Sequence, residues 1–211
     1  MEIETVGELN LLISQGSDKV RELIRISEAL HEKKYAEIAD EIVKRKKIRL
    51  ITIAGPSSSG KTTSAKRIAL HLKVHGLRPI SISLDDFFLE RDKTPRDEFG
   101  NYDFESINAL DLDLFNKTMN DLIDGKEVMM PKFDFTSGRR TWYPKPLKIE
   151  KDQPIIIEGI HGLNEVLTSS IPRETKFKIY ISSLTQMNLD SMNRIPTTDT
   201  RLIRRLVRDN H

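Results

Sequence analysis

The sequence contains no cysteine among its 211 residues. This absence excludes disulfide bonds and metal sites built on thiolates, and it fits a reducing compartment. There is also no apolar stretch of membrane-spanning length, and the first residues, M-E-I-E-T-V-G-E, lack the basic and apolar regions of a signal peptide. We therefore expect a cytoplasmic protein with no membrane partner.

An excess of charge of either sign is missing as well. Lys and Arg total 34 against 32 Asp and Glu, which gives a net charge of +2. This balance provides no overall attraction to nucleic acids, so we do not expect a nucleic-acid partner. The hydrophobic content of 37% is enough for one sizeable core with a small appended element. The oligomeric state is left open.

A phosphate-binding motif is the most informative feature that is present. Residues 53–63 read I-A-G-P-S-S-S-G-K-T-T, which contains the pattern G-x-x-x-x-G-K-[ST]. Gly55 and Gly60 allow turns that direct backbone N–H groups inward, and the following helix adds its positive dipole end. Lys61 is suited to neutralise the β- and γ-phosphates, and Thr62 to supply a hydroxyl for Mg²⁺. The residues expected to bind a nucleoside triphosphate here are Gly55, Ser57, Ser58, Ser59, Gly60, Lys61, Thr62 and Thr63.

The motif lies between a predicted strand and a predicted helix, as its mechanism requires. Residues 49–54 are apolar and β-branched, and residues 62–74 carry apolar side chains at helical spacing. Further strands are predicted at 79–84, 154–158 and 176–182, with helical segments between them. This alternation predicts an α/β fold with a parallel sheet covered by helices on both faces.

Before this region, residues 6–47 have the apolar stripes of helices, with Ser17 a plausible N-cap. We therefore divide the chain into a helical extension or connector, 1–47, and an α/β domain that carries the phosphate-binding motif, 48–211.

Acidic residues follow two of the predicted strands. Ligands of open parallel sheets bind at the carboxyl ends of the strands, where Asp85, Asp86 and Glu158 lie. Glu158 ends the buried run I-I-I-E and is suited to hold Mg²⁺ directly or through water. Asp85 or Asp86 is suited to deprotonate an acceptor hydroxyl, and side-chain alternation directs only one of them toward the phosphates. The alternative is that both begin a solvated loop.

Two segments could recognise an acceptor. Residues 89–105 form a polar stretch too long for an ordinary connection, which is typical of functional or disordered loops. Residues 131–140 read P-K-F-D-F-T-S-G-R-R and precede T-W-Y-P-K-P-L, which alternates like a small β-ribbon. The aromatic residues here fit a satellite core and an acceptor pocket equally well.

Four arginines near the end of the sequence are spaced for one face of a helix. They are Arg201, Arg204, Arg205 and Arg208. A solvated helix face usually mixes in acidic partners, so this stripe favours a mobile lid that closes over phosphates. A nucleic-acid-binding face is the weaker alternative at this net charge.

With these residues in view, the sequence resembles the uridine kinase and phosphoribulokinase family of phosphate-loop kinases. The likeness runs from about residue 48 to 209 and includes G-P-S-S-S-G-K-T-T, S-L-D-D-F-F, D-F-E-S-I-N-A-L-D, P-K-F-D-F-T-S-G-R-R, I-I-I-E-G-I and T-R-L-I-R-R-L-V-R-D, in the family's order. Together these segments are far more specific than the loop alone.

The resemblance implies roles for individual residues. It selects Asp85 over Asp86 as the catalytic acid/base near Mg²⁺, with Lys61 and Arg205 beside it in the catalytic set. Thr62 and Glu158 match the metal-side positions. The helix near 199–210 resembles the lid that closes on ATP, which assigns Arg201, Arg204 and Arg208 to the nucleotide. The expected acceptor-binding residues are Phe88, Asp103, Glu105, Phe133, Phe135 and Arg140, with Glu105 preferred to Asp103 for the acceptor hydroxyls.

The sequence also departs from that family. Uridine and cytidine kinases typically place tyrosine where Phe88 and Phe133 stand, and a base-contacting histidine where Gly138 stands. Losing these polar groups removes hydrogen bonds that would read a pyrimidine, so the acceptor is expected to differ from uridine. Family members continue beyond the point that corresponds to His211, which implies a fragment or a shortened member. The helical extension resembles a connector in longer bacterial proteins that carry a threonyl-tRNA-synthetase-like region.

The leading hypothesis is therefore a small-molecule kinase that uses ATP and Mg²⁺ to phosphorylate a hydroxyl group. The alternative is a nucleotide-binding regulatory module with little or no kinase activity, in which the helical extension passes the state of the lid to a partner. Simple ATP hydrolysis is disfavoured, because the acidic loop and the D-F-E segment would have no function in that reaction.

Overall fold

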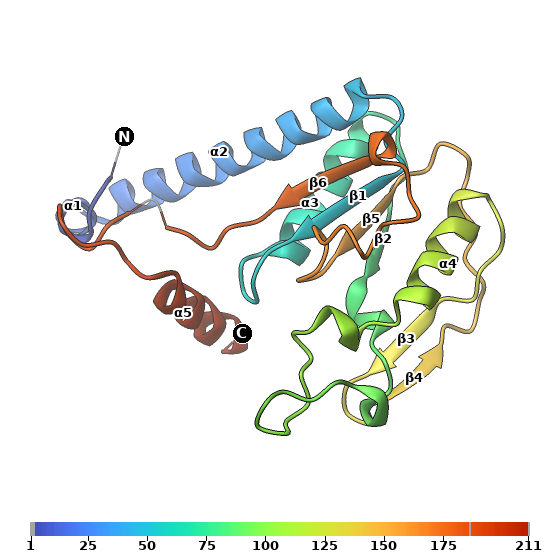
Figure 1. Ribbon diagram of the computed structural model, residues 1–211. Helices are drawn as coiled ribbons and strands as arrows, with labels where there is room; N and C mark the ends of the chain where they lie inside the picture. The colour runs from blue at the N-terminus through green and yellow to red at the C-terminus, as the bar shows by residue number, and fades with distance from the viewer. Residues whose placement is uncertain (1–2, 186, 211) are drawn as a thin grey trace.

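The computed structural model describes residues 3–185 and 187–210. Its centre is a four-stranded parallel sheet in the order β2-β5-β1-β6 (Figure 1). The strands are β1 (Leu50–Ala54), β2 (Ile80–Ser83), β5 (Ile155–Glu158) and β6 (Lys176–Tyr180). The two central strands, β1 and β5, are apolar apart from Thr52 and the final Glu158, as expected for strands that are covered on both faces. This architecture confirms the predicted α/β fold.

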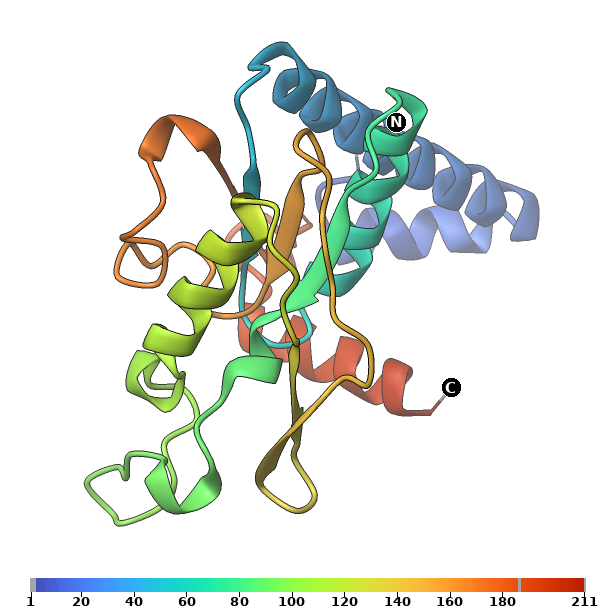
Figure 2. The same ribbon diagram turned by 90° about the vertical axis from the view of Figure 1, so that its right-hand side faces the viewer.

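Successive residues of the central strands feed two separate hydrophobic cores. Ile155 and Ile157 of β5 face a core that includes α4 (Leu112–Ile123), whereas Ile156 faces a core built with α3 (Lys61–Val74). Figure 2 shows α4 on one side of the sheet and the N-terminal helices with α3 on the other. The strand alternation therefore fixes the sheet between two helical layers.

The N-terminal segment is helical, as predicted, but it is divided. α1 (Val6–Ser14) and α2 (Ser17–Lys44) are separated at Gly16, whose φ of 111° interrupts the helix. Gly16 is the N-cap of α2, so the assignment of Ser17 as the cap was wrong. The domain boundary between residues 47 and 48 stays a prediction. None of the helices that the structure describes combines the length and apolar character required of a membrane span.

α2 lies along α3, the helix that follows the phosphate-binding motif. The Tyr35 hydroxyl is 3.1 Å from the Ser64 hydroxyl, and Ala39 and Ile42 are buried in the shared core. Nε2 of His71 is 2.9 Å from a carboxylate oxygen of Glu32. The N-terminal extension is therefore packed on the helix that supports the motif.

A two-stranded antiparallel hairpin lies beside the sheet. It consists of β3 (Pro131–Asp134) and β4 (Arg139–Trp142), so the ribbon predicted for residues 141–147 begins ten residues earlier and includes only the first two of them. Short 3₁₀ segments at Leu84–Phe87, Arg91–Lys93, Ile107–Ala109 and Arg173–Thr175 connect the remaining elements. The last helix, α5 (Thr197–Asp209), follows a long strap after β6.

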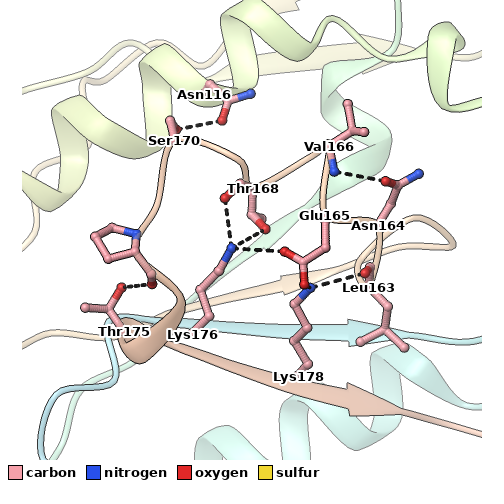
Figure 3. A network of polar contacts seen from close by, with 11 residues as sticks. Asn116, Leu163, Asn164, Glu165, Val166, Thr168, Ser170, Thr175, Lys176 and Lys178 are labelled. Carbon is pink, nitrogen blue, oxygen red and sulfur yellow. Dashed lines mark hydrogen bonds and ion pairs between the residues drawn. The ribbon is translucent and has the colours of Figure 1, made fainter.

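A buried lysine fastens the segment that follows β5. The Lys176 side chain is 5% exposed, and its Nζ donates to the Thr168 carbonyl at 3.0 Å and hydroxyl at 3.2 Å. Glu165 accepts from Lys176 at 3.3 Å and from Lys178 at 2.6 Å (Figure 3). These contacts tie residues 159–172 to β6.

We expect Lys176→Ala to lower the free energy of unfolding by about 2 kcal/mol, because the buried Thr168 groups lose their donor. Lys178→Ala is the matched control: its side chain is partly exposed, and its loss should cost about 1 kcal/mol or less. Urea unfolding followed by circular dichroism measures both. Equal destabilisation by the two substitutions would contradict the assigned role of Lys176.

Candidate active site

The phosphate-binding motif forms the loop between β1 and α3. Gly60 is the N-cap of α3 and has a φ of 101°. At Gly55 a Cβ atom would lie 2.3 Å from the carbonyl oxygen of Ile181, so the backbone directly after β6 excludes any side chain there. Ser58 also has a positive φ, 61°, which a non-glycine residue adopts only where the surrounding structure imposes it. The loop is thus held in a curled conformation with its amides at a helix N-terminus.

A cavity of about 780 Å³ opens over this loop. It reaches the carboxyl ends of β2 and β5, where the sequence places its acidic residues. The predicted site residues that line it are Ser57, Ser58, Gly60, Lys61, Thr62, Thr63, Asp85, Glu158, Arg204 and Arg208. Gly55 and Ser59 belong to the loop but are buried, and neither lines the cavity.

The structure separates Asp85 from Asp86. Asp85 lines the cavity, whereas Asp86 accepts a hydrogen bond from the Phe133 backbone N–H at 3.3 Å and faces the hairpin. Asp85 is open to the cavity, but the surrounding protein removes part of its water, and this burial raises its pKa; Lys61 opposes the shift. Of the two carboxylates, Asp85 is therefore the one that lines the cavity at the end of β2.

Lys61 lies among opposite charges at the centre of the loop. Burial lowers the pKa of its ammonium group, and the nearby Glu158 and Asp85 partly reverse that shift. Its Nζ donates to the carbonyl oxygen of Pro56 at 3.2 Å. This contact holds the ammonium group against the opposite end of the loop, where it would lie close to an anion bound by the loop amides.

The residues present fit a Mg²⁺ ion bound together with phosphates. The Thr62 hydroxyl donates to a Glu158 carboxylate oxygen at 3.0 Å, so a hydroxyl and a carboxylate converge beside the loop. Within residues 3–185 and 187–210, no group of three or more acidic or imidazole side chains forms a metal cage. Mg²⁺ usually takes one or two protein ligands and completes its shell with phosphate oxygens and water, which agrees with this donor set.

Helix α5 lies over the loop, and its arginines are not equivalent. Arg201 Nε donates to the Ser57 carbonyl at 3.0 Å, and Arg204 Nε donates to the Ser58 carbonyl at 2.9 Å. Arg205 instead pairs with Asp209, which also accepts from Arg208. The predicted stripe therefore divides into two arginines on the loop and two that share an acidic partner.

The predicted acceptor-side phenylalanines form an aromatic cluster. Phe88 and Phe133 are buried, whereas Phe135 is 51% exposed and packs edge-on against both at centroid distances of 5.6 and 4.9 Å. Arg140 donates to Asp111 at 2.8 Å and to the Phe88 carbonyl at 2.9 Å, so its guanidinium group braces this cluster. Phe135 offers the most exposed surface of the cluster; the acceptor contacts of the other residues stay predictions.

Gly138 turns the hairpin and lies against Arg91. Its φ is 69°, and a Cβ atom there would be 2.7 Å from Nε of Arg91. The Arg91 backbone N–H donates to the Gly138 carbonyl at 3.0 Å. A histidine at this position would need a different hairpin turn and a displaced arginine.

Several side chains at the site carry no recognisable sequence motif. Ile160, Ile203 and Val207 form an apolar part of the cavity wall. Burial lowers the pKa of His161, and this shift is opposed first by hydrogen bonding to the Ser106 and Glu105 backbone and then by the nearby Asp103 and Glu105 carboxylates. Its Nε2 atom is buried and makes no hydrogen bond within the described residues.

Comparison with known proteins gives a consistent result. The model of the "Phosphoribulokinase / Uridine kinase family" matches residues 50–211. The uridine kinase of Lactobacillus helveticus is 30% identical over 160 residues, which cover 76% of this chain and 67% of that protein. The uridine kinase of Ligilactobacillus salivarius is 28% identical over 160 residues, or 76% and 66% of the two chains. The matched segment spans about two thirds of the length of these relatives.

A solved structure agrees at the level of the fold. The structure of a possible uridine kinase from Bacillus stearothermophilus superposes with a TM-score of 0.51 at 21% identity, covering 72% of this chain and 74% of that chain.

Proposed function

The chain belongs to the phosphoribulokinase / uridine kinase family, and from this premise we propose that it transfers the γ-phosphoryl group of ATP to a hydroxyl group of a small molecule. One observation carries the proposal: the phosphate-binding loop, Asp85 and Glu158 line the same cavity. A site for nucleotide binding alone would not need a second carboxylate, Asp85, in the same cavity as the loop and Glu158. Its presence supports group transfer to a second substrate.

Each of these residues has a distinct task in the proposed reaction. The amides of the first turn of α3 have no intrahelical partner and are free to bind phosphate oxygens. Lys61 neutralises charge that develops on the phosphates. Thr62 and Glu158 would hold Mg²⁺, which supplies electrostatic stabilisation of the phosphates when it is bound.

Asp85 orients and deprotonates the acceptor. Its carboxylate accepts the proton of the acceptor hydroxyl as the new bond from oxygen to the γ-phosphorus forms and the bond to the β-phosphate oxygen breaks. The products are a phosphate ester and ADP. A carboxylate with a raised pKa, as burial gives Asp85, is better matched to this proton transfer near neutral pH than an ordinary aspartate.

The acceptor is proposed to differ from a pyrimidine nucleoside. Phe88 and Phe133 carry no hydroxyl group and are buried, and Arg91 occupies the space beside Gly138. Asp103 and Glu105 flank Phe104, which packs against Phe88, and His161 lies near both carboxylates; these polar groups suit the hydroxyls of an uncharged polyol or sugar. Phe135 supplies an exposed apolar face beside them.

A nucleotide-binding regulatory module is the second candidate. One observation favours it: the start of α1 is hydrogen-bonded to the strap that leads to α5. Such a module would bind ATP and change the position of α5 without an acceptor.

Mg²⁺-dependent release of ADP from ATP tests the proposal against a panel of nucleosides, nucleoside monophosphates, sugars and small polyols. We expect one class of hydroxyl compound to stimulate release well above an acceptor-free control, and pyrimidine nucleosides to stimulate it least. A flat response together with confirmed ATP binding would favour the regulatory module. Rapid release without any acceptor would instead indicate a hydrolase.

A further inference from the structure

The start of the chain is attached to the strap that carries α5. Val6 N–H donates to the carbonyl oxygen of Asn188 at 3.0 Å, and Asn188 N–H donates to the carbonyl oxygen of Glu4 at 2.7 Å. Thr5 and Asn188 are the partners of this parallel bridge. In Figure 1 the segment that follows β6 runs beside α1 before it turns back to α5. We call residues 4–6 together with Asn188 the N-terminal clasp.

Both sides of the clasp are locally ordered. The Glu8 carboxylate accepts from the backbone N–H groups of Glu4 and Thr5 at 2.7 and 3.0 Å, and the Thr5 hydroxyl caps α1 in return. These N–H bonds lower the pKa of Glu8, so its carboxylate stays ionised as an acceptor. This capping box fixes the backbone that meets Asn188.

On the other side, the strap folds into a compact loop directly before α5. Asn188 is bridged to Arg194, and Leu189 N–H donates to the Asn193 carbonyl at 2.8 Å. The Asp190 carboxylate accepts from the backbone N–H of Asn193 at 2.8 Å. Only two residues separate Arg194 from the first residue of α5. A restraint at Asn188, which is bridged to Arg194, therefore also limits the movement of the helix.

The remaining contacts form a closed chain of elements that begins and ends at the phosphate-binding loop. α1 contacts α2, α2 packs on α3, and α3 begins at the phosphate-binding loop. The strap leads from the clasp to α5, and α5 returns to the same loop through Arg201 and Arg204. The Nη groups of these arginines can reach phosphates bound at the loop only while the helix stays over it.

We propose that the N-terminal clasp positions α5, so that Val6 and Asn188 act through Arg201 and Arg204 to retain the nucleotide. The part of this inference that concerns nucleotide retention rests on the proposed function. The part that concerns the position of α5 does not. Val6 and Asn188 are positioning residues, because neither lines the cavity. Breaking the clasp should therefore loosen α5 and leave the loop itself unchanged.

Val6→Pro removes one hydrogen bond of the N-terminal clasp and should leave the stability of α1 unchanged. Val6 is the first residue of the helix, where proline is favoured because its missing N–H has no helical partner. Thr5 has φ −133° and ψ 158°, the extended conformation that a residue before proline adopts. Val6→Ala is the matched control, since it shortens the side chain and keeps the N–H donor.

Hydrogen exchange and nucleotide dissociation report on the clasp in the full chain. We expect amides of α5 in the nucleotide-free Val6→Pro protein to exchange about fivefold faster than in Val6→Ala, the factor given by one hydrogen bond of average net strength. Dissociation of the non-hydrolysable analogue adenylyl imidodiphosphate with Mg²⁺ should accelerate by a similar factor. Equal exchange of α5 in the two variants, or slower dissociation in Val6→Pro, would overturn the proposal.

A reversible lock gives a second test that does not depend on a proline. Neighbouring strands lie about 4.8 Å apart, which is within the Cα separation of roughly 4.4–6.8 Å that disulfides span. Because the sequence has no cysteine, Thr5→Cys combined with Asn188→Cys can form only this disulfide within one chain. Exchange of α5 should be slower in the oxidised protein than after reduction with dithiothreitol. Identical exchange in both redox states would also overturn the proposal.

The two proposals can fail separately. If no acceptor supports turnover but Val6→Pro still accelerates exchange in α5, the kinase proposal fails and the clasp stands. If turnover is acceptor-dependent but α5 exchange does not respond to the clasp, only the clasp fails.

Discussion

Asp85→Asn is expected to lower acceptor-dependent turnover by roughly 10²–10⁴-fold, the usual contribution of a general base. The substitution keeps the size of the side chain but removes the group that accepts the hydroxyl proton. Affinity for adenylyl imidodiphosphate should stay near that of the unchanged protein, because the loop and Lys61 supply most of the phosphate contacts. Steady-state kinetics and calorimetry on the same preparation measure the two effects.

Asp86→Asn is the matched control for this substitution. Asp86 is the next residue, but its carboxylate accepts from Phe133 N–H on the hairpin side, and an asparagine oxygen can keep that bond. Its effect on turnover should therefore be far smaller. Equal losses in the two variants would mean that the substitutions act through the shape of the segment and not through the Asp85 carboxylate.

The pH dependence of kcat/KM provides an independent readout of Asp85. Because burial raises its pKa, the fraction of ionised base falls at a higher pH than for an ordinary aspartate, and kcat/KM should fall with it as the pH is lowered. Between the unfolded and the raised folded pKa, the folded state binds more protons, so this group's contribution to stability decreases as pH rises. Asp85→Asn should therefore remove the acidic limb without lowering stability at neutral pH. An unchanged acidic limb in that variant would assign it to another group.

Lys61→Met is expected to weaken nucleotide binding and to lower turnover by roughly 10²–10³-fold, as does the loss of one preorganised charge-stabilising donor. The ammonium group faces bound phosphates and also opposes the desolvation of Asp85. Without it the pKa of Asp85 should rise further, which shifts the acidic limb of any residual activity upward. Calorimetry with adenylyl imidodiphosphate and steady-state kinetics measure these effects.

Lys66→Met controls for the loss of one positive charge on the same helix. Lys66 is exposed and does not line the cavity. It should leave both nucleotide affinity and turnover close to their original values. Matching losses in the two lysine variants would show that the effect comes from net charge and not from the position of Lys61.

Much of the fold and of the phosphate side of the site could be predicted because the signals are local. Strand, loop and helix around residues 53–63 are encoded in consecutive residues, and the glycine pattern specifies the turn at Gly60. β5 is an apolar run that ends at Glu158, and β2 alternates isoleucine with serine shortly before Asp85. The meeting of Asp85 and Glu158 at one cavity therefore follows from the parallel sheet. The start of α2 was predicted to within one residue, because Ser17 is a residue type that favours N-caps, whereas the structure places the cap at Gly16.

The remaining features depend on contacts between residues distant in the sequence. Equal spacing could not separate Arg204, which reaches the loop, from Arg205, which pairs with Asp209. Nor could composition show that Phe88 is buried while Phe135 stays half exposed. The clasp is formed by backbone groups, which carry no side-chain signature in any sequence.

The central claim is tested most directly by identifying the product that receives the phosphoryl group. ATP labelled with ³²P at the γ position should yield a labelled phosphate ester of the stimulating acceptor, in amounts equal to the ADP formed, and Asp85→Asn should abolish the ester. Labelled inorganic phosphate without an ester would contradict the account and indicate a hydrolase. Tight ATP binding with no labelled product from any acceptor would contradict it in favour of the regulatory module.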